Sequence, residues 1–274
     1  MIAAALVTAA CGTVPASATG TASSAAPSTR PTSDPATTPS AAPSGTTPAT
    51  LRVVGLGDSV TSGEHCDCDD YVTGFGHLLA ARTGGKVHVT DDGESGSTSE
   101  DLADELTAND DDDRVLQADV TDADVVVVTM GANDLAPALD AWRAGSCDAS
   151  CTDPEVASMR SDLDRVLDRV QALTGGHARV LVTTYWNVFT DGDVARSAER
   201  SGYLAWSDAL TREANAAITA VADAHAATLV DLYAPFKGDG SGDPTNLLAS
   251  DGDHPDAAGT ALISRTVLAA YVGS

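Results

Sequence analysis

Basic side chains are scarce in this sequence: 15 lysines and arginines stand against 40 aspartates and glutamates, for a formal net charge of -25 at pH 7. A surface with this excess of negative charge repels polyanions, so nucleic-acid binding is excluded. The sequence also lacks a run of about 20 apolar residues, the length that a helix needs to cross a bilayer, which excludes a polytopic membrane protein. Aromatic residues make up only 4%, yet 43% of the 274 residues are hydrophobic, enough for a sizeable core.

Charge is also absent from residues 1–10, which are mostly small or aliphatic and are followed by Cys11. The segment 6–11 resembles a bacterial lipobox, in which the cysteine is lipidated after a secretory signal is cleaved. We therefore expect residues 1–11 to be the remnant of a signal peptide. Cys11 would then anchor an extracellular, cell-surface protein to the membrane through lipid alone. The alternative is a short apolar N-terminus with a chance cysteine.

Residues 12–50 consist almost entirely of Ala, Ser, Thr, Pro and Gly. A segment of this composition cannot bury a core, so we expect it to be disordered. It is typical of a flexible linker that holds a folded body away from a wall or membrane, although a disordered tail without a spacing role has the same composition. No second change of composition follows, and residues 51–274 are therefore expected to form one domain.

Short apolar runs alternate with longer helical segments from residue 51 onward. The runs are mostly rich in Val and Leu, as expected of strands buried on both faces, and they cover residues 51–56, 87–89, 123–129, 178–184 and 228–232. Helices are expected over residues 71–82, 99–106, 154–173, 199–226 and 255–271. This alternation predicts a parallel sheet with helices on both faces. Such sheets place their chemistry at the carboxyl ends of the strands.

Four cysteines lie in this domain, Cys66, Cys68, Cys147 and Cys151, and an even number in an exported chain favours disulfides. A bridge between Cys147 and Cys151 is sterically easy. One between Cys66 and Cys68 closes a very tight ring, so cross-pairing of the two loops is an alternative. A four-thiolate zinc site is a further alternative, for which C-x-C spacing is atypical. The four acids at 110–113 lack the glycine of a calcium loop and are more typical of a solvated turn.

The first predicted strand leads into Gly57-Asp58-Ser59, which places a serine where a nucleophile is expected. Because Thr61 occupies the position of the last glycine of a G-x-S-x-G elbow, an ordinary α/β-hydrolase is disfavoured. Taken alone, the triplet is also typical of a glycine-rich turn with a capping side chain.

A serine hydroxyl is a poor nucleophile until a base removes its proton. His254 is the best candidate, because Asp251 precedes it by three residues in a turn and can fix the tautomer of the imidazole. Pro255 suits the first position of the last helix. A helix-capping turn rich in acids is the alternative interpretation of this segment.

Ester cleavage also needs hydrogen-bond donors for the oxyanion. Gly96 follows the second strand and would let a backbone N–H approach a substrate, and Asn133 follows the third strand and offers a side-chain amide. A capping loop and an Asn-Asp turn are the alternatives. After the fourth strand, Tyr185, Trp186 and Phe189 are candidates to line a substrate pocket, unless they only pack the loop.

Taken in order, these segments resemble the SGNH or GDSL-type hydrolase family. Gly57-Asp58-Ser59 matches its first block, Gly96 its second, residues 131–134 its G-x-N-D block and residues 251–254 its D-x-x-H block. The resemblance spans residues 51–274. The second block departs from the family, because acids, Asp91 and Asp92, replace the usual Asn ahead of the Ser-Gly pair.

The resemblance implies an α/β fold, a three-layer α/β/α flavodoxin-like sandwich with a five-stranded parallel sheet. It also implies a triad in which Ser59 is the nucleophile, His254 the base and Asp251 the residue that orients it. The oxyanion hole would consist of the N–H groups of Ser59 and Gly96 and the amide of Asn133.

We therefore expect a serine esterase that hydrolyses carboxylic esters of short-acyl, lipid or acylated-sugar type through an acyl-enzyme, without metal or cofactor. Its partner would be a small-molecule or acylated glycan or lipid ester, and the protein is expected to be a monomer. Acyl transfer to a sugar acceptor would use the same residues. A surface lipoprotein that binds an acyl or glycan ligand without cleaving it is a further alternative, because fold does not dictate function.

Overall fold

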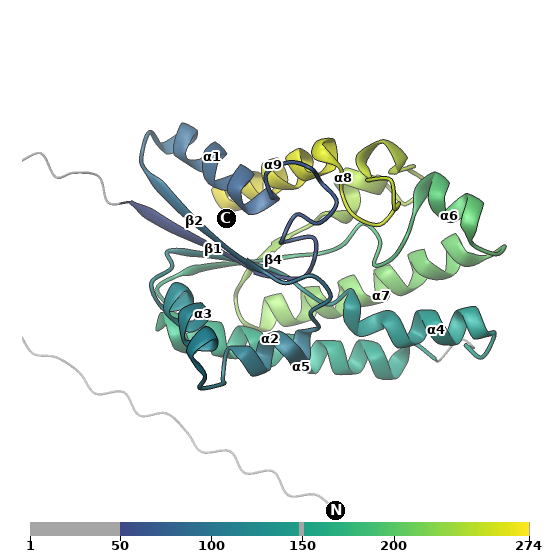
Figure 1. Ribbon diagram of the computed structural model, residues 1–274, viewed down its shortest axis with the longest axis horizontal. Helices are drawn as coiled ribbons and strands as arrows, with labels where there is room; N and C mark the ends of the chain where they lie inside the picture. Colours follow the sequence, from purple (N-terminus) through teal and green to yellow (C-terminus); the bar gives the residue numbers. More distant parts are fainter. Residues whose placement is uncertain (1–49, 148–150, 274) are drawn as a thin grey trace, which may run out of the picture. The chain divides into compact units, whose positions relative to one another are not determined.

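The computed structural model describes residues 50–147 and 151–273 (Figure 1). The predicted signal remnant, the predicted lipidation site Cys11 and all but the last residue of the predicted linker lie outside these residues. Within residues 50–147 and 151–273, none of the helices combines the length and the apolar composition of a membrane span.

The fold is built on a parallel sheet of five strands in the order β2-β1-β3-β4-β5. The strands are β1 (Leu51–Gly57), β2 (Val87–Gly93), β3 (Val125–Thr129), β4 (Arg179–Thr183) and β5 (Thr228–Val230). Every residue of β3 is buried, as expected for a central strand covered on both faces. The α/β fold with a five-stranded parallel sheet is thereby confirmed.

Helices cover both faces of the sheet, with α1 and α9 on one side and α2, α5 and α7 on the other (Figure 1). The described helices are α1 (Tyr71–Thr83), α2 (Ser99–Glu105), α3 (Asp111–Thr121), α4 (Ala136–Ala144), α5 (Asp153–Thr174), α6 (Gly192–Ala198), α7 (Tyr203–Ala224), α8 (Tyr233–Lys237) and α9 (Ala257–Gly273). Because β2 and β3 lie on opposite sides of β1, the chain leaves β1 and β3 in different directions. A crevice is expected at the carboxyl ends of these two strands.

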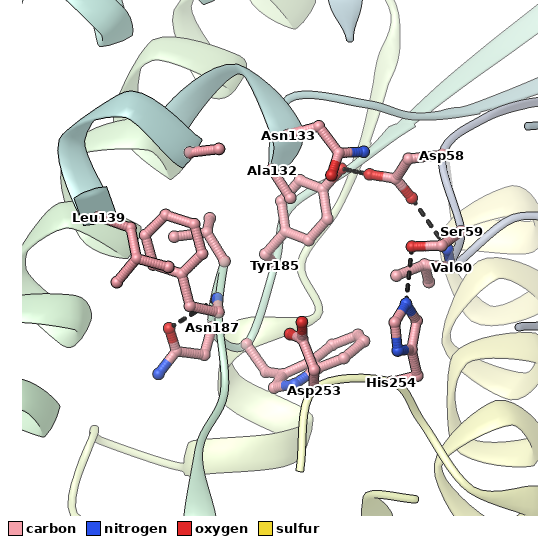
Figure 2. A pocket seen from close by; sticks show the side chains of 14 residues that line it. Asp58, Ser59, Val60, Ala132, Asn133, Leu139, Tyr185, Asn187, Asp253 and His254 are labelled. Carbon is pink, nitrogen blue, oxygen red and sulfur yellow. Dashed lines mark hydrogen bonds between the residues drawn. The ribbon is translucent and has the colours of Figure 1, made fainter. Parts of the chain in front are cut away.

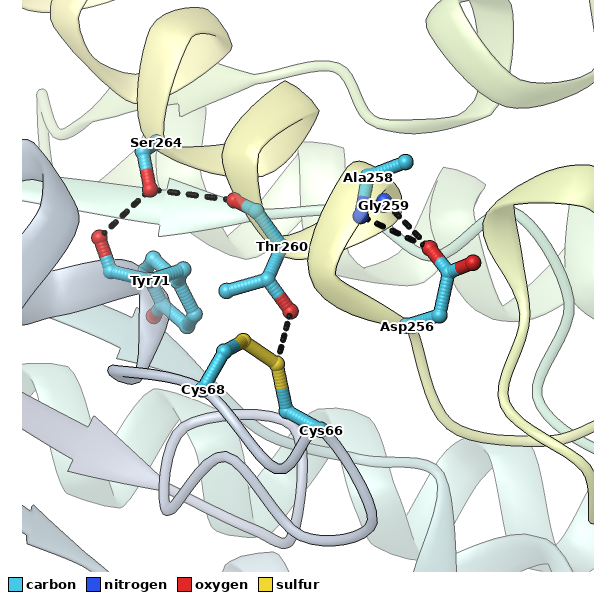
Figure 3. Close-up of a disulfide and its surroundings, with 8 residues drawn as sticks. All are labelled: Cys66, Cys68, Tyr71, Asp256, Ala258, Gly259, Thr260 and Ser264. Carbon is cyan, nitrogen blue, oxygen red and sulfur yellow. Dashed lines mark hydrogen bonds between the residues drawn. A yellow bond between two sulfur atoms is a disulfide. The ribbon is translucent and has the colours of Figure 1, made fainter.

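Local capping explains where two of the helices near this crevice begin. Thr98 and Asp101 form a capping box, in which each side chain accepts a hydrogen bond from the other residue's backbone N–H, so α2 begins directly after the loop that carries Gly96. Asp256 accepts hydrogen bonds from the N–H groups of Ala258 and Gly259 at 2.8 and 2.9 Å and caps α9 (Figure 3).

Three expectations about element boundaries are wrong. The last helix does not start at Pro255, because the Asp256 cap sets its start at Ala257. The run 110–113 is not a solvated turn but the start of α3. Asp110 is its N-cap and accepts hydrogen bonds from two backbone N–H groups, and the three acids after it stabilise the positive end of the helix dipole. The predicted helix 199–226 begins only at Tyr203, after a turn that separates it from α6.

The departure in the second block also lies in a different element from the one expected. Asp91 and Asp92 belong to β2, which extends to Gly93 and pairs with β1 over its whole length, so they precede the Gly96 loop instead of packing it. Burial, with neighbouring acids adding to it, raises the pKa of Asp91 to about 7 and that of Asp92 to about 6.

Candidate active site

The turn after β1 fixes the position of Ser59. At Gly57 the chain passes so close to β3 that a Cβ atom would overlap the carbonyl oxygen of Thr129, and only glycine fits. The next residue, Asp58, donates its N–H to that same oxygen at 3.1 Å. Ser59 therefore stands at the carboxyl end of β1, where the crevice between β1 and β3 opens.

Asp58 holds this turn from inside. Its buried carboxylate accepts the N–H of Val60 at 3.0 Å and the hydroxyl of Tyr185, from the segment after β4. Burial raises the pKa of Asp58 to about 6, although both of these hydrogen bonds act to lower it. Burial also raises the pKa of Tyr185, and the charge of Asp58 adds to that effect. Tyr185 is therefore tied to the turn that carries Ser59.

A continuous chain of hydrogen bonds joins Ser59 to the turn before α9. The Nε2 atom of His254 lies 2.8 Å from the Oγ of Ser59, across 195 sequence positions (Figure 2). The Nδ1 atom of the same ring lies 2.5 Å from Oδ2 of Asp251. This is the arrangement in which a carboxylate orients an imidazole toward a hydroxyl group.

Asp251 is itself fixed by the backbone of its own turn. Its Oδ1 atom accepts the N–H groups of Asp253 and His254 at 3.1 and 3.2 Å. Burial acts to raise the pKa of Asp251, but the hydrogen bonds from His254 and from this backbone hold it below its usual value. Asp251 therefore stays a carboxylate, the form that can stabilise an imidazolium.

The oxyanion donors predicted from the sequence, Gly96 and Asn133, follow the ends of β2 and β3. Gly96 has φ of +86°, a conformation that favours glycine. In the described part of the chain, the N–H groups of Ser59 and Gly96 donate to no acceptor. The amide of Asn133 donates to the carbonyl of Ser97 at 2.8 Å, and Asp134 accepts the N–H of Ser99 at 3.0 Å. The loops after β2 and β3 are thus linked.

A cavity of about 160 Å³ adjoins Ser59 and His254. Tyr185, Asn133 and Asp253 line it (Figure 2). Trp186 and Phe189 also line it, whereas Gly96 lies outside its lining. Its other lining residues are Asp58, Val60, Ala132, Ala136, Leu139, Asn187 and Val188. The aromatic residues also pack the loop, since Trp186 is 1% exposed and stacks on Phe236 with ring centroids 4.4 Å apart. These aromatic side chains therefore both line the cavity and pack the loop after β4.

The cysteines form two disulfides, Cys66–Cys68 and Cys147–Cys151, so neither cross-pairing nor a four-thiolate zinc site is present. The first disulfide rests against α9, where the hydroxyl of Thr260 donates to the Sγ of Cys66 at 3.3 Å (Figure 3). It thereby anchors the loop that follows Ser59.

That loop brings two further side chains to the site that the sequence had not indicated. The Nε2 atom of His65 lies 3.7 Å from Oδ2 of Asp251, and a carboxylate oxygen of Glu64 lies 3.9 Å from Nε2 of His254. His65, Asp251 and His254 form the one trio in the described residues close enough to hold a metal ion. Because Asp251 and His254 already bind each other, we assign no metal to it. His65 also has φ of +61°, which no sequence pattern predicts.

A buried ionic network of Lys237, Asp191 and Asp208 contacts the turn that carries two of the site residues. The Nζ atom of Lys237 lies 2.8 Å from Oδ2 of Asp191 and 3.3 Å from Oδ1 of Asp208. Asn187 donates its amide to Asp191 at 3.1 Å. The N–H of Asp191 in turn donates to the carbonyl of Gly252 at 2.7 Å, inside the turn that carries Asp251 and His254. No pattern in the sequence predicts this network.

A parallel α/β sheet with a serine, a histidine and an aspartate joined at the carboxyl edge defines the class of protein, an α/β enzyme with a hydrolase-type site. A family model described as GDSL-like Lipase/Acylhydrolase family matches residues 56–262. The chain belongs to this family and is a carboxylic ester hydrolase, which confirms the resemblance found in the sequence.

Solved structures share the fold at low sequence identity. The lipase Lip_vut3 from a goat rumen metagenome is 19% identical, with a TM-score of 0.66 over 81% of this chain and 97% of its own. A lipase/acylhydrolase from Enterococcus faecalis is 22% identical, with a TM-score of 0.56 over 82% and 96%. An acetylxylan esterase from Geobacillus stearothermophilus, a catalytic mutant, is 18% identical, with a TM-score of 0.56 over 80% and 93%. No curated protein matches the chain.

Proposed function

We propose that this ester hydrolase acts through an acyl-enzyme formed on Ser59. His254 removes the proton from the Ser59 hydroxyl as the oxygen attacks the ester carbonyl, and then delivers that proton to the leaving alcohol. Water then attacks the acyl-enzyme with His254 again as the base. The bond between the acyl group and Ser59 breaks, and the carboxylic acid is released. The hydrogen-bonded chain from Asp251 through His254 to Ser59 is the observation that carries this proposal.

The oxyanion of each tetrahedral intermediate would be held by the N–H groups of Ser59 and Gly96 and by the amide of Asn133. In support, both N–H groups lack an acceptor in the described part of the chain, and Asn133 lines the same cavity as Ser59. Removing one such donor costs about 3 kcal/mol of transition-state stabilisation.

The substrates proposed are esters of short acyl groups. The cavity beside Ser59 measures about 160 Å³, close to the volume of about 150 Å³ that holds one benzene molecule in an engineered protein cavity. Esters of sugars fit the same chemistry, and the acetylxylan esterase is a structural relative with that alcohol portion. Acyl transfer to a sugar would use the same groups, and product analysis with a competing acceptor alcohol separates it from hydrolysis.

The proposal is tested with the full chain, a fluorophosphonate probe and a short p-nitrophenyl ester. The probe is expected to label the wild type, and Ser59→Ala should abolish both labelling and turnover. Ser62→Ala is the matched control, because Ser62 lies in the same turn, and it should keep labelling. His254→Ala should also abolish turnover. Full activity in Ser59→Ala or His254→Ala would refute the proposed mechanism.

We also propose that the protein is a monomer at the cell surface, attached through lipidated Cys11. Its two disulfides support an oxidising, extracellular setting. Cys11→Ala is expected to release the protein from the membrane fraction, and size-exclusion chromatography of the released protein should give a mass near 27.7 kDa. An unchanged membrane fraction for Cys11→Ala would refute the anchor.

A further inference from the structure

Asp253 is a charged residue of the cavity that the mechanism does not use. It lies between the two triad residues of its turn, and Figure 2 shows its carboxyl group directed into the cavity beside Ser59. Within the described part of the chain, this carboxyl group accepts no hydrogen bond, whereas its neighbour Asp251 accepts three. Asp253 is partly exposed, and a carboxyl group left open toward a cavity is available to whatever enters it.

The surroundings of Asp253 favour a partner with positive charge. Burial above all raises the pKa of Asp253 to about 6; His254 lowers it, while Asp251 and Glu64 raise it. The group is therefore mainly a carboxylate at pH 7.5. No lysine or arginine is among the described residues that line the cavity, and His254 is the one basic side chain in that lining.

In the proposed mechanism, the acyl portion of the ester would occupy this cavity. The cavity is bordered by Ser59, which carries the acyl group, and by Asn133, toward which its carbonyl oxygen would point. The alcohol must leave past Nε2 of His254, near Glu64 and His65, whose side chains are 38% and 52% exposed. An acyl chain in the cavity therefore extends toward Asp253 while the alcohol departs to solvent.

We propose that Asp253 makes the enzyme selective for short acyl groups that carry a protonated amine, so that its preferred substrates are aminoacyl esters. This inference rests on the proposed function. The ammonium group would donate a charge-assisted hydrogen bond to the Asp253 carboxylate, a pairing that an alkyl group of the same size cannot make. The bonds that form and break in hydrolysis are unchanged.

The test uses ethyl esters of three acyl groups of equal length: butanoyl, 3-aminopropanoyl and 3-hydroxypropanoyl. Each is hydrolysed by the full chain at pH 7.5 and followed by pH-stat. In the wild type, kcat/KM for the amino ester is expected to exceed that for the butanoyl ester by about tenfold, the value of one hydrogen bond to a charged group. The hydroxy ester is expected to lie between the two.

Asp253→Asn is expected to lower kcat/KM for the amino ester about tenfold, to the level of the butanoyl ester, so that the preference is lost. Asp223→Asn, on the exposed face of α7, removes the same charge away from the cavity and should keep the preference. Thermal unfolding of both variants checks that they are folded.

Three results would overturn the selectivity: a wild type that prefers the butanoyl ester, one that prefers the hydroxy ester, or an Asp253→Asn variant that slows all three esters equally. The last would show that Asp253 acts on His254 and not on the acyl group. Failure of the proposed function looks different, since fluorophosphonate would not label Ser59 and no ester would be turned over.

Discussion

Replacing Lys237 tests whether the ionic network beneath the site stabilises the fold. The Lys237 side chain is 7% exposed and that of its partner Asp191 is 4% exposed. Lys237→Met keeps most of the side-chain length but removes the charge, so Asp191 and Asp208 lose their shared cation. Breaking a buried ion pair by removing one partner costs about 3 to 5 kcal/mol, because an uncompensated buried charge remains.

The lower end of that range is expected here. Asp191 would keep its hydrogen bonds from Asn187 and from the N–H of Gly192, at 3.1 and 2.7 Å. Asp208 is 23% exposed and keeps Arg212 at 2.8 Å. We therefore expect Lys237→Met to lower the free energy of unfolding by about 3 kcal/mol. Urea denaturation of the full chain, followed by circular dichroism, measures this value.

Arg196→Gln is the matched control. Arg196 pairs with Asp193 and Asp243 at 2.8 and 2.6 Å, but its side chain is 42% exposed and those of its partners are more so. Surface ion pairs contribute about 0 to 1 kcal/mol, so this variant should lose no more than that. Equal losses in the two variants, or a Lys237→Met protein within about 1 kcal/mol of the wild type, would refute the reasoning.

Three further predictions concern the site itself. The pKa of Asp58 is about 6 in the folded protein and about 3.9 in an unfolded chain, so the free energy of unfolding should fall by up to about 3 kcal/mol as pH rises from about 4 to 6. Asp58→Asn should remove this part of the decline in denaturation curves. Gly96→Ala should lower kcat by about 10²-fold, the loss expected of a displaced oxyanion donor. It should also lower Tm, because alanine is strained at the Gly96 φ of +86°, although no atom lies within 4 Å of the added Cβ. Asp251→Asn should lower kcat by about 10⁴-fold in steady-state assays at an unchanged KM; an unaffected kcat in either of these last two variants would contradict the assigned roles.

Sequence patterns alone predicted the sheet and the order of the four segments around it. Runs such as 125–128, four consecutive valines, have one stable environment, a strand buried on both faces. The helices α3, α4, α6 and α8 were missed. The short ones among them have little periodicity and are stabilised mainly by tertiary packing. The segment 110–113 was wrongly predicted to be a turn, because a run of acids is typical both of a turn and of the start of a helix.

The tertiary structure decided which side chains share one space. Spacing within the sequence indicated that Asp251 can reach His254, since three residues of one turn separate them. The hydrogen bond between His254 and Ser59 depends on the order of the strands in the sheet. The hydrogen bond from the Tyr185 hydroxyl to Asp58 depends on it too. The direction of Asp253 into the cavity likewise follows from the path of its turn. The local sequence therefore determined which candidate reactive groups are present. Long-range packing set the distances between them and their burial, on which their reactivity depends.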